Sequence, residues 1–271
     1  MPVDLKGKVV LITGASSGFG REAAHLFAQE GCKVALAARR LNRLQELADQ
    51  IQDLGGEAIA IPVDVTQRAE IDIMLRSLLD IYGKIDILFN NAGFGSVEFF
   101  EDLDPERDIE TQVQVNLTGL MLVTRAVLPH MIARQQGHII NMVSISAWIS
   151  APTYTVYGAA KAGVRSFTNA LRREVARQGI HVSAIYPAPS KTEFTQKSTR
   201  KHRKPGWFKY LFIPPERVAQ RVVDLAERPR RAVTLPGWFP LIGFFDFTAP
   251  AIVDWFMDVL YTKRIKRQEK K

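Results

Sequence analysis

The chain has 271 residues, of which 46% are hydrophobic and 24% are charged, a balance typical of a globular protein that can bury one sizeable core. Its single cysteine, Cys32, excludes an intramolecular disulfide. The formal net charge of +8 comes from two late basic segments, residues 191–209 and 263–271, and because neither holds a motif that reads DNA or RNA we expect no nucleic-acid partner.

The amino terminus enters an apolar run at residue 9. This run is too short for the apolar region of a signal peptide, and no cleavage site precedes it. We therefore expect a cytoplasmic protein.

Short β-branched runs alternate with longer amphipathic stretches along most of the chain. The runs that predict strands are residues 9–13, 33–37, 57–62, 85–90, 138–143, 181–186 and 231–235. The stretches that predict helices are residues 20–29, 41–54, 68–82, 110–134 and 216–227. This alternation is typical of right-handed βαβ units. We expect an α/β fold: a single Rossmann-type, doubly wound parallel sheet with helices on both faces.

A glycine-rich segment, residues 13–20, follows the first predicted strand and opens a predicted helix. Glycines let the backbone turn tightly and approach a pyrophosphate, and the helix start offers free N–H groups. The spacing is G-x-x-x-G-x-G rather than G-x-G-x-x-G. A glycine-rich turn used only for packing is the alternative. The residues expected to bind a dinucleotide here are Gly14, Ser16, Ser17, Gly18, Phe19 and Gly20.

Two arginines, Arg39 and Arg40, follow the second predicted strand. An acidic residue at this place holds the ribose 2′-hydroxyl of NAD, whereas arginine accommodates the 2′-phosphate of NADP. Guanidinium groups match phosphate with charge-assisted hydrogen bonds. The pair therefore predicts a preference for NADP(H). Solvated charges at a helix start are the alternative, which applies better to Arg40 than to Arg39.

A further polar segment follows a strand. Asn90-Asn91-Ala92-Gly93 comes after the fourth predicted strand, where its amides can bind a cofactor or fix a turn.

Tyr157 and Lys161 lie four residues apart, on one helix face. A phenol has a pKa of ~10, and a nearby cation lowers it. Tyr157 could then exchange a proton with an alcohol oxygen during hydride transfer to or from a nicotinamide. Ser144 could hydrogen-bond the same oxygen.

Together these segments resemble the classical short-chain dehydrogenase/reductase family, from about residue 8 to about residue 235. The resemblance rests on Thr-Gly-x-x-x-Gly-x-Gly at 13–20, Asn-Asn-Ala-Gly at 90–93, and Ser144 thirteen residues before Tyr157. It implies seven strands and a homodimer or homotetramer. It also implies that Tyr157 is the general acid/base, that Lys161 binds the nicotinamide ribose and tunes Tyr157, and that Ser144 positions the substrate oxygen.

The same resemblance assigns further positions. Asn116 matches an asparagine that takes part in a proton relay through water. Cofactor contacts are implied for Asp64, Val65, Asn91, Ala92, Gly93, Tyr157, Lys161, Pro187 and Thr192. The sequence departs from the family at Ala188, where a glycine is usual, and an alanine is strained there if the backbone φ is positive. We predict no metal site.

The regular alternation ends after residue 186. We predict an NADP-binding catalytic domain over residues 1–235, with a substrate lid over 188–215, and an apolar and basic extension over 236–271. The basic lid could be a solvated loop, bind an acidic or phosphate-bearing handle, or dock at an anionic lipid surface.

In the extension, Asp246, Asp254 and Asp258 argue against a membrane-spanning helix. Residues 254–260, followed by a basic run, are typical of an interfacial helix or of a dimer-capping helix.

The predicted function is interconversion of a carbonyl and a secondary alcohol on a small hydrophobic substrate, with peripheral association at an anionic membrane surface as a hypothesis. The candidates for the substrate pocket are Phe94, Ile145, Trp148 and Phe194. One alternative is a 3-oxoacyl-carrier or coenzyme A reductase, which the basic lid favours. Another is a non-catalytic NADP-binding sensor or scaffold, which would not require Tyr157 and Lys161.

Overall fold

The computed structural model describes residues 2–194 and 212–268, with side chains described up to Val259. The central part of the predicted lid, with most of its basic residues, and the basic side chains at the carboxyl end therefore lie outside the described residues.

Seven parallel strands form one sheet in the order β3-β2-β1-β4-β5-β6-β7. The strands are β1 (Val9–Thr13), β2 (Lys33–Ala38), β3 (Glu57–Pro62), β4 (Ile87–Asn90), β5 (Gly137–Met142), β6 (Ile180–Pro187) and β7 (Ala232–Leu235). The predicted fold class is confirmed. The order changes direction between β1 and β4, and ligands bind beyond the carboxyl ends of strands at such a switch point.

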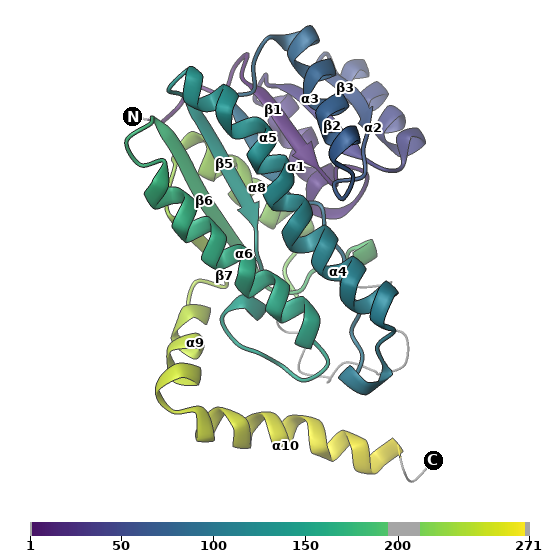
Figure 1. Cartoon of the computed structure of the whole chain (residues 1–271), viewed down its shortest axis with the longest axis vertical. Helices are drawn as coiled ribbons and strands as arrows, with labels where there is room; N and C mark the ends of the chain where they lie inside the picture. The colour runs from purple at the N-terminus through teal and green to yellow at the C-terminus, as the bar shows by residue number, and fades with distance from the viewer. Residues whose placement is uncertain (1, 195–211, 269–271) are drawn as a thin grey trace.

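Helices cover both faces of the sheet (Figure 1). One face packs against α1 (Gly18–Gln29), α2 (Leu41–Asp53) and α8 (Pro215–Glu227). The other packs against α3 (Arg68–Tyr82), α5 (Leu120–Ala133) and α6 (Thr155–Glu174). Successive strand residues point to opposite faces, so Val10 and Ile12 enter the first core while Val9 and Leu11 enter the second. Burial on both faces explains the continuous apolar runs.

The segment before α5 is less regular than the single helix that the sequence predicts over 110–134. It runs through the short helix η1 (Phe100–Asp102), the π-helical turn η2 (Pro105–Glu110), α4 (Thr111–Val113) and a second π-helical turn, η3 (Gln114–Gly119). Turns of this kind are frequent at functional sites.

By length and composition Pro105–Ala133 could cross a membrane. In this fold, however, α5 is a core helix that packs against α3 and the sheet.

Two more helices follow β7. They are α9 (Phe239–Thr248) and α10 (Pro250–Gln268), which extend as an arm away from the sheet (Figure 1). The sequence predicts a helix only over 254–260. Residues 239–248 are apolar on nearly every side, so they lack the periodicity by which an amphipathic helix is recognised.

Candidate active site

A cleft of about 1140 Å³ opens at the carboxyl ends of the strands. All the residues that the sequence proposes as catalytic line it, and so do the proposed cofactor contacts except Gly20. Among the four proposed substrate residues, Phe94, Ile145 and Phe194 line the cleft and Trp148 does not. Gly20 and Trp148 are thus the two proposed site residues that do not line the cleft.

Gly20 has a packing role next to the glycine-rich loop. A Cβ at this position would lie 2.6 Å from both the Gly14 carbonyl oxygen and the Asn91 amide nitrogen. Asn91 in turn donates from its side-chain amide to the carbonyl oxygens of Thr13, at 3.1 Å, and Gly14, at 3.2 Å. The Asn91 side chain thus holds the loop in place, which is the turn-fixing role that the sequence left open.

The loop backbone also requires glycine at position 14. Gly14 has a φ of +68°, and a Cβ there would approach the Ala92 Cα to 2.8 Å. We expect Gly14→Ala to lower the free energy of unfolding by about 3 kcal/mol or more, because a strained backbone is combined with a close contact. Gly55→Ala is the matched control, since Gly55 has a φ of +82° but a Cβ there meets nothing within 4 Å. The control should lose only about 1–2 kcal/mol. Equal losses in chemical denaturation would contradict the close packing.

Arg40 lies closer to the glycine-rich loop than its predicted solvated role requires. Its guanidinium donates to the Ser16 hydroxyl at 2.9 and 3.2 Å and to the Ser17 hydroxyl at 3.0 Å. It also pairs with the Glu193 carboxylate at 2.9 Å. By contrast, the Arg39 side chain is 71% exposed, and its nearest carboxylate oxygen, on Asp64, is 3.9 Å away. Both guanidinium groups therefore border the cleft, one held in place and the other open to solvent.

Glu193 joins the segment after β6 to the start of α2. Its carboxylate accepts hydrogen bonds from Arg40 and Arg43, which lower its pKa to about 2. The preceding Thr192 lies against the glycine-rich loop, because a Cβ on Gly18 would be 3.5 Å from the Thr192 Cβ. This segment therefore crosses the cleft near the glycine-rich loop.

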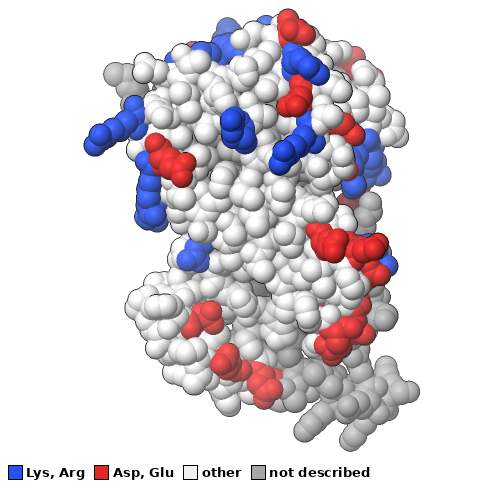
Figure 2. Space-filling view, in the orientation of Figure 1, with Lys and Arg blue, Asp and Glu red and all other residues white. Residues whose placement is uncertain are grey.

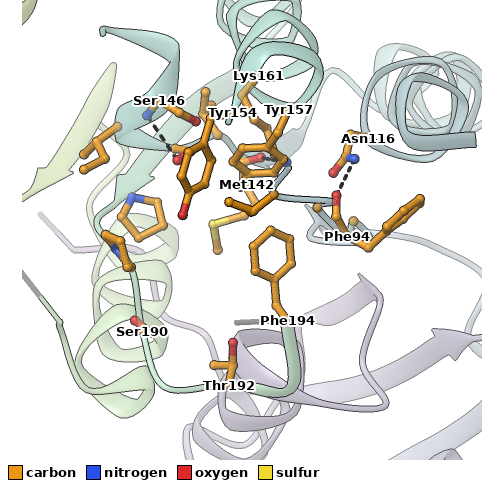
Figure 3. A pocket seen from close by; sticks show the side chains of 18 of the residues that line it. Phe94, Asn116, Met142, Ser146, Tyr154, Tyr157, Lys161, Ser190, Thr192 and Phe194 are labelled. Carbon is orange, nitrogen blue, oxygen red and sulfur yellow. Dashed lines mark hydrogen bonds between the residues drawn. The ribbon is translucent and has the colours of Figure 1, made fainter. Parts of the chain in front are cut away.

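Tyr157 and Lys161 project from α6 into the floor of the cleft (Figure 3). The Lys161 ammonium donates to the Met142 carbonyl oxygen at 2.9 Å and lies 5.8 Å from the centre of the Tyr157 ring. Burial lowers the pKa of Lys161 to about 8. Burial also raises the pKa of Tyr157 to about 12, although a hydrogen bond with Ser144 opposes the shift.

The sequence predicts the opposite direction for the pKa of Tyr157. The structure corrects this, because Lys161 directs its ammonium to a carbonyl oxygen while burial destabilises the phenolate. Tyr157 is therefore protonated at neutral pH. A protonated phenol is the form that donates to a carbonyl oxygen.

Asn116 lies in the π-helical turn η3 and is fully buried. Its side-chain amide donates to the carbonyl oxygens of Phe94, at 2.7 Å, and Gln112, at 2.8 Å. Its amide oxygen has no hydrogen-bond partner among the described residues and is directed toward Gly93, where a Cβ would come within 2.5 Å. The turn thus presents an unpaired acceptor beside the cleft, which a water molecule could satisfy.

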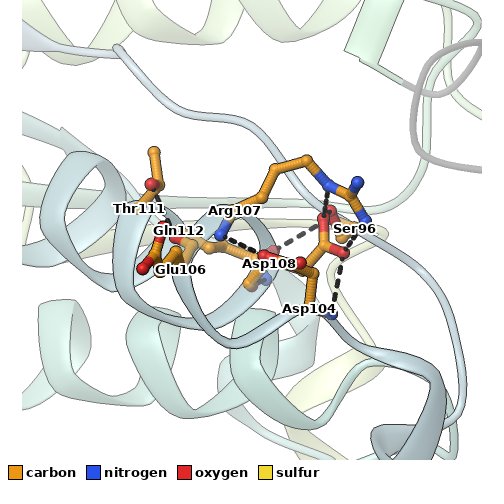
Figure 4. A network of polar contacts seen from close by, with 7 residues as sticks. All are labelled: Ser96, Asp104, Glu106, Arg107, Asp108, Thr111 and Gln112. Carbon is orange, nitrogen blue, oxygen red and sulfur yellow. Dashed lines mark hydrogen bonds and ion pairs between the residues drawn. The ribbon is translucent and has the colours of Figure 1, made fainter.

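A polar network that the sequence did not predict holds the loop after β4 (Figure 4). The Ser96 hydroxyl donates to Asp108 at 2.7 Å, and the Ser96 backbone N–H donates to Gln112 at 3.0 Å. The Arg107 guanidinium holds the pKa of the Asp108 carboxyl well below its usual range. These contacts fix the loop that carries Phe94. Of these residues only Gln112 lies in the helix that the sequence predicts over 110–134.

Ala188 causes none of the strain that its replacement of glycine suggested. Among the described residues, the non-glycine positions with positive φ are Gln135 and Thr153. Ala188 is buried beside Ile145 and Phe239, and its N–H donates to the Leu235 carbonyl oxygen at 2.7 Å. The alanine methyl group thus contributes to apolar packing.

The outer cleft is apolar and reaches the carboxyl-terminal arm. Phe194 packs its ring 5.4 Å from that of Tyr157 (Figure 3). The Trp148 ring instead packs against Arg165, whose guanidinium carbon lies 4.2 Å from the ring centre, and against Tyr186, whose ring centre lies 5.4 Å away. The cleft residues contributed by the arm, which the sequence did not assign to the site, are Trp238, Phe239, Ile242, Ile252, Val253, Trp255, Phe256 and Met257. The one feature of the sequence that could have pointed to these residues as part of the site is their high density of aromatic side chains.

Comparisons with known proteins agree with this geometry. A family model described as short chain dehydrogenase matches residues 8–203. An uncharacterized oxidoreductase of Listeria innocua is 36% identical over 83% of this chain and 92% of its own length. An 11-beta-hydroxysteroid dehydrogenase 1A of Arabidopsis thaliana is 30% identical over 95% of this chain and 76% of its own length. The crystal structure of a 3-ketoacyl-(acyl-carrier-protein) reductase of Brucella melitensis complexed with NADH has a TM-score of 0.76 and 32% identity, covering 85% of this chain and 97% of that one.

Proposed function

Because the chain belongs to the short chain dehydrogenase family and is an oxidoreductase, we propose that it interconverts a carbonyl and a secondary alcohol on a hydrophobic substrate with NADP(H). The observation that carries the proposal is the position of Tyr157. Its phenol lies where the loop that would hold a dinucleotide meets an apolar cleft. A proton donor is needed at such a junction, since hydride transfer to a carbonyl leaves an alkoxide.

Four side chains would carry the proton chemistry. Tyr157 donates its proton to the carbonyl oxygen during reduction and takes one back during oxidation. Ser144 hydrogen-bonds the same oxygen and holds it in line. Lys161 binds the nicotinamide ribose and offers a positive charge as the phenolate forms. Asn116 orders water beside the site through its unpaired amide oxygen, and a proton from solvent returns to Tyr157 through this water.

The cofactor is NADP(H), whose nicotinamide supplies or accepts the hydride when bound. The fit is supported by Gly14 and Gly18, where a side chain would fill the space beside Ala92 and Thr192. Arg39 and Arg40 would bind the 2′-phosphate, because both border the cleft beside the loop hydroxyls. The adenine would lie against Asp64 and Val65. Pro187 and Thr192 would contact the nicotinamide side.

The substrate is a hydrophobic small molecule, as the apolar lining from Phe94, Ile145 and Phe194 supports. We assign residues 1–235 to the catalytic domain and residues 236–271 to an extension that completes the pocket. Family resemblance supports a homodimer or homotetramer. The extension also supports peripheral association with an anionic membrane surface.

Reduction of 3-oxoacyl groups on a carrier protein or coenzyme A is a second candidate function. It is favoured by the basic residues between 191 and 209, and by the likeness to the Brucella reductase. These basic residues would pair with the phosphate of the pantetheine handle. The two candidates differ in substrate and share the site.

A substrate panel tests the proposal. Consumption of NADPH and NADH is measured with hydrophobic ketones, aldehydes and 3-oxoacyl thioesters. We expect NADPH-dependent turnover that is fastest with bulky hydrophobic ketones. Preferential turnover of thioesters would favour the second candidate. Tight NADPH binding with no turnover of any compound would contradict both and favour a non-catalytic sensor or scaffold.

A further inference from the structure

The arm formed by α9 and α10 exposes an unusual amount of apolar surface. Of the fourteen exposed large hydrophobic side chains among the described residues, eight lie between Trp238 and Phe256. The Phe247 side chain is 86% exposed, Ile252 is 68% exposed and Trp255 is 66% exposed. In Figure 2 the lower part of the molecule, where the arm lies, is mostly uncharged and is interrupted by a few acidic patches. Exposed apolar patches of this kind mark interaction sites.

The exposed side chains share one side of each helix. On α9, Leu241, Phe244 and Phe245 follow the i, i+3, i+4 spacing and are exposed, whereas Phe239 is buried against the body. A Cβ on Gly243 would lie 3.1 Å from Trp148, so this side of α9 contacts the body closely. Within the described part of the chain, α9 is therefore packed against the body on one side and exposed on the other.

On α10 the same division holds. Ile252, Trp255 and Phe256 repeat the i, i+3, i+4 spacing and are exposed. Val253 and Met257 contact the buried cluster that contains Ile145. Asp254 and Asp258 lie four residues apart, and Asp258 borders the apolar stripe because it follows Trp255 by three residues. The acidic groups therefore flank the exposed apolar surface.

The bend between the helices excludes one spanning arrangement. Together Phe239–Thr248 and Pro250–Val259 are apolar enough to cross a membrane, but they meet at 113°. A straight span is therefore not formed. Two helices at this angle, each with one exposed apolar side, are suited to lie within the headgroup region of a bilayer.

Charge favours a lipid partner over a second copy of the chain. The sequence after Leu260 contains Lys263, Arg264, Lys266 and Arg267, with no acidic residue before Glu269. Basic residues next to an apolar helix attract anionic lipid headgroups. A symmetric contact between two arms would instead bring two such basic runs into one assembly, with only the Asp246, Asp254 and Asp258 carboxylates of each arm to offset them. An anionic bilayer supplies both the apolar and the acidic partner.

The exposed surface continues into the cleft. Ile252, Trp255 and Phe256 are exposed and also line the cleft. Deeper in the cleft are Phe194 and Tyr157. We infer that α9 and α10 dock on an anionic membrane surface and that the cleft takes its substrate directly from the lipid. The substrate class is then a carbonyl compound dissolved in the bilayer. This inference rests on the proposed function for its second part.

The test uses the full chain and a double variant, Phe244→Glu with Phe247→Glu. Both residues are exposed and neither lines the cleft. The matched control is Leu54→Glu with Ile81→Glu, because Leu54 is 78% exposed, Ile81 is 58% exposed and both are remote from the arm. Co-sedimentation is measured with vesicles of phosphatidylcholine alone and of equal parts phosphatidylcholine and phosphatidylserine. NADPH turnover is measured with a water-soluble ketone and with a long-chain ketone dissolved in the vesicles.

We expect the wild-type chain and the control to bind the mixed vesicles more tightly than phosphatidylcholine alone. The arm variant should bind at least about tenfold more weakly. It should lose turnover of the vesicle-dissolved ketone to a similar degree and keep turnover of the soluble ketone. Equal binding by the arm variant and the control would overturn the docking surface. The docking surface would also be overturned if the wild-type chain bound no vesicles and formed a dimer that the arm variant abolished.

The two proposals fail in different ways. Vesicle binding without turnover of either ketone would contradict the proposed function and leave the docking surface standing. Turnover of the vesicle-dissolved ketone that is equal in the arm variant and the wild type would overturn uptake from lipid, while the oxidoreductase activity would stand.

Discussion

Tyr157→Phe is expected to lower kcat for carbonyl reduction by about 10³-fold, while NADPH binding changes little. General acid catalysis by a positioned group contributes about 10²–10⁴-fold, and the phenol is the proton donor in the proposed mechanism. Phenylalanine keeps the ring contact with Phe194, which lies 5.4 Å away between ring centres, so the fold should persist. Single-turnover kinetics with NADPH, combined with a fluorescence titration of NADPH binding, separates chemistry from binding.

The matched control is Tyr154→Phe. Tyr154 also lines the cleft, and its ring lies 6.3 Å from that of Tyr157, so this variant removes a phenolic hydroxyl from the same neighbourhood. It should retain kcat within about threefold of the wild type. If Tyr157→Phe kept wild-type turnover, or if both variants lost activity equally, the assignment of Tyr157 as the proton donor would be wrong.

The double variant Arg39→Ala with Arg40→Ala is expected to raise the KM for NADPH by about 100-fold and to change the KM for NADH little. Each guanidinium makes charge-assisted contacts to the 2′-phosphate in the proposed complex, and hydrogen bonds of this type contribute about 1.5–3 kcal/mol each. NADH has a hydroxyl at that position and does not need them. Steady-state kinetics with both cofactors measures the change in preference.

Arg43→Ala controls for the loss of the Glu193 ion pair. Arg43 pairs with the same carboxylate as Arg40 but does not line the cleft, so its removal should leave the preference for NADPH intact. Arg40 also holds the Ser16 and Ser17 hydroxyls. If the double variant raised the KM for NADH and for NADPH equally, the arginines would only support the loop. The proposed selectivity for NADP would then be wrong.

Much of the cleft around the glycine-rich loop could be predicted from the sequence, because its signals are local. A strand buried on both faces is a continuous apolar run, so residues 9–13 were recognised with their observed bounds. The glycine at position 14 is required by the backbone of its own turn. Tyr157 and Lys161 share a helix face through their spacing alone.

Only the tertiary structure decided the rest, because those features depend on segments distant in the chain. Trp148 adjoins the motif at Ser144, yet contacts with Arg165 and Tyr186 turn it away from the cleft. The arm reaches the cleft from more than ninety residues after Ser144, and no local pattern encodes that contact. The direction of the pKa of Tyr157 was also inaccessible, since desolvation is set by everything that surrounds the phenol. Spacing along a helix determines which groups can meet, whereas burial by the whole fold determines their charge.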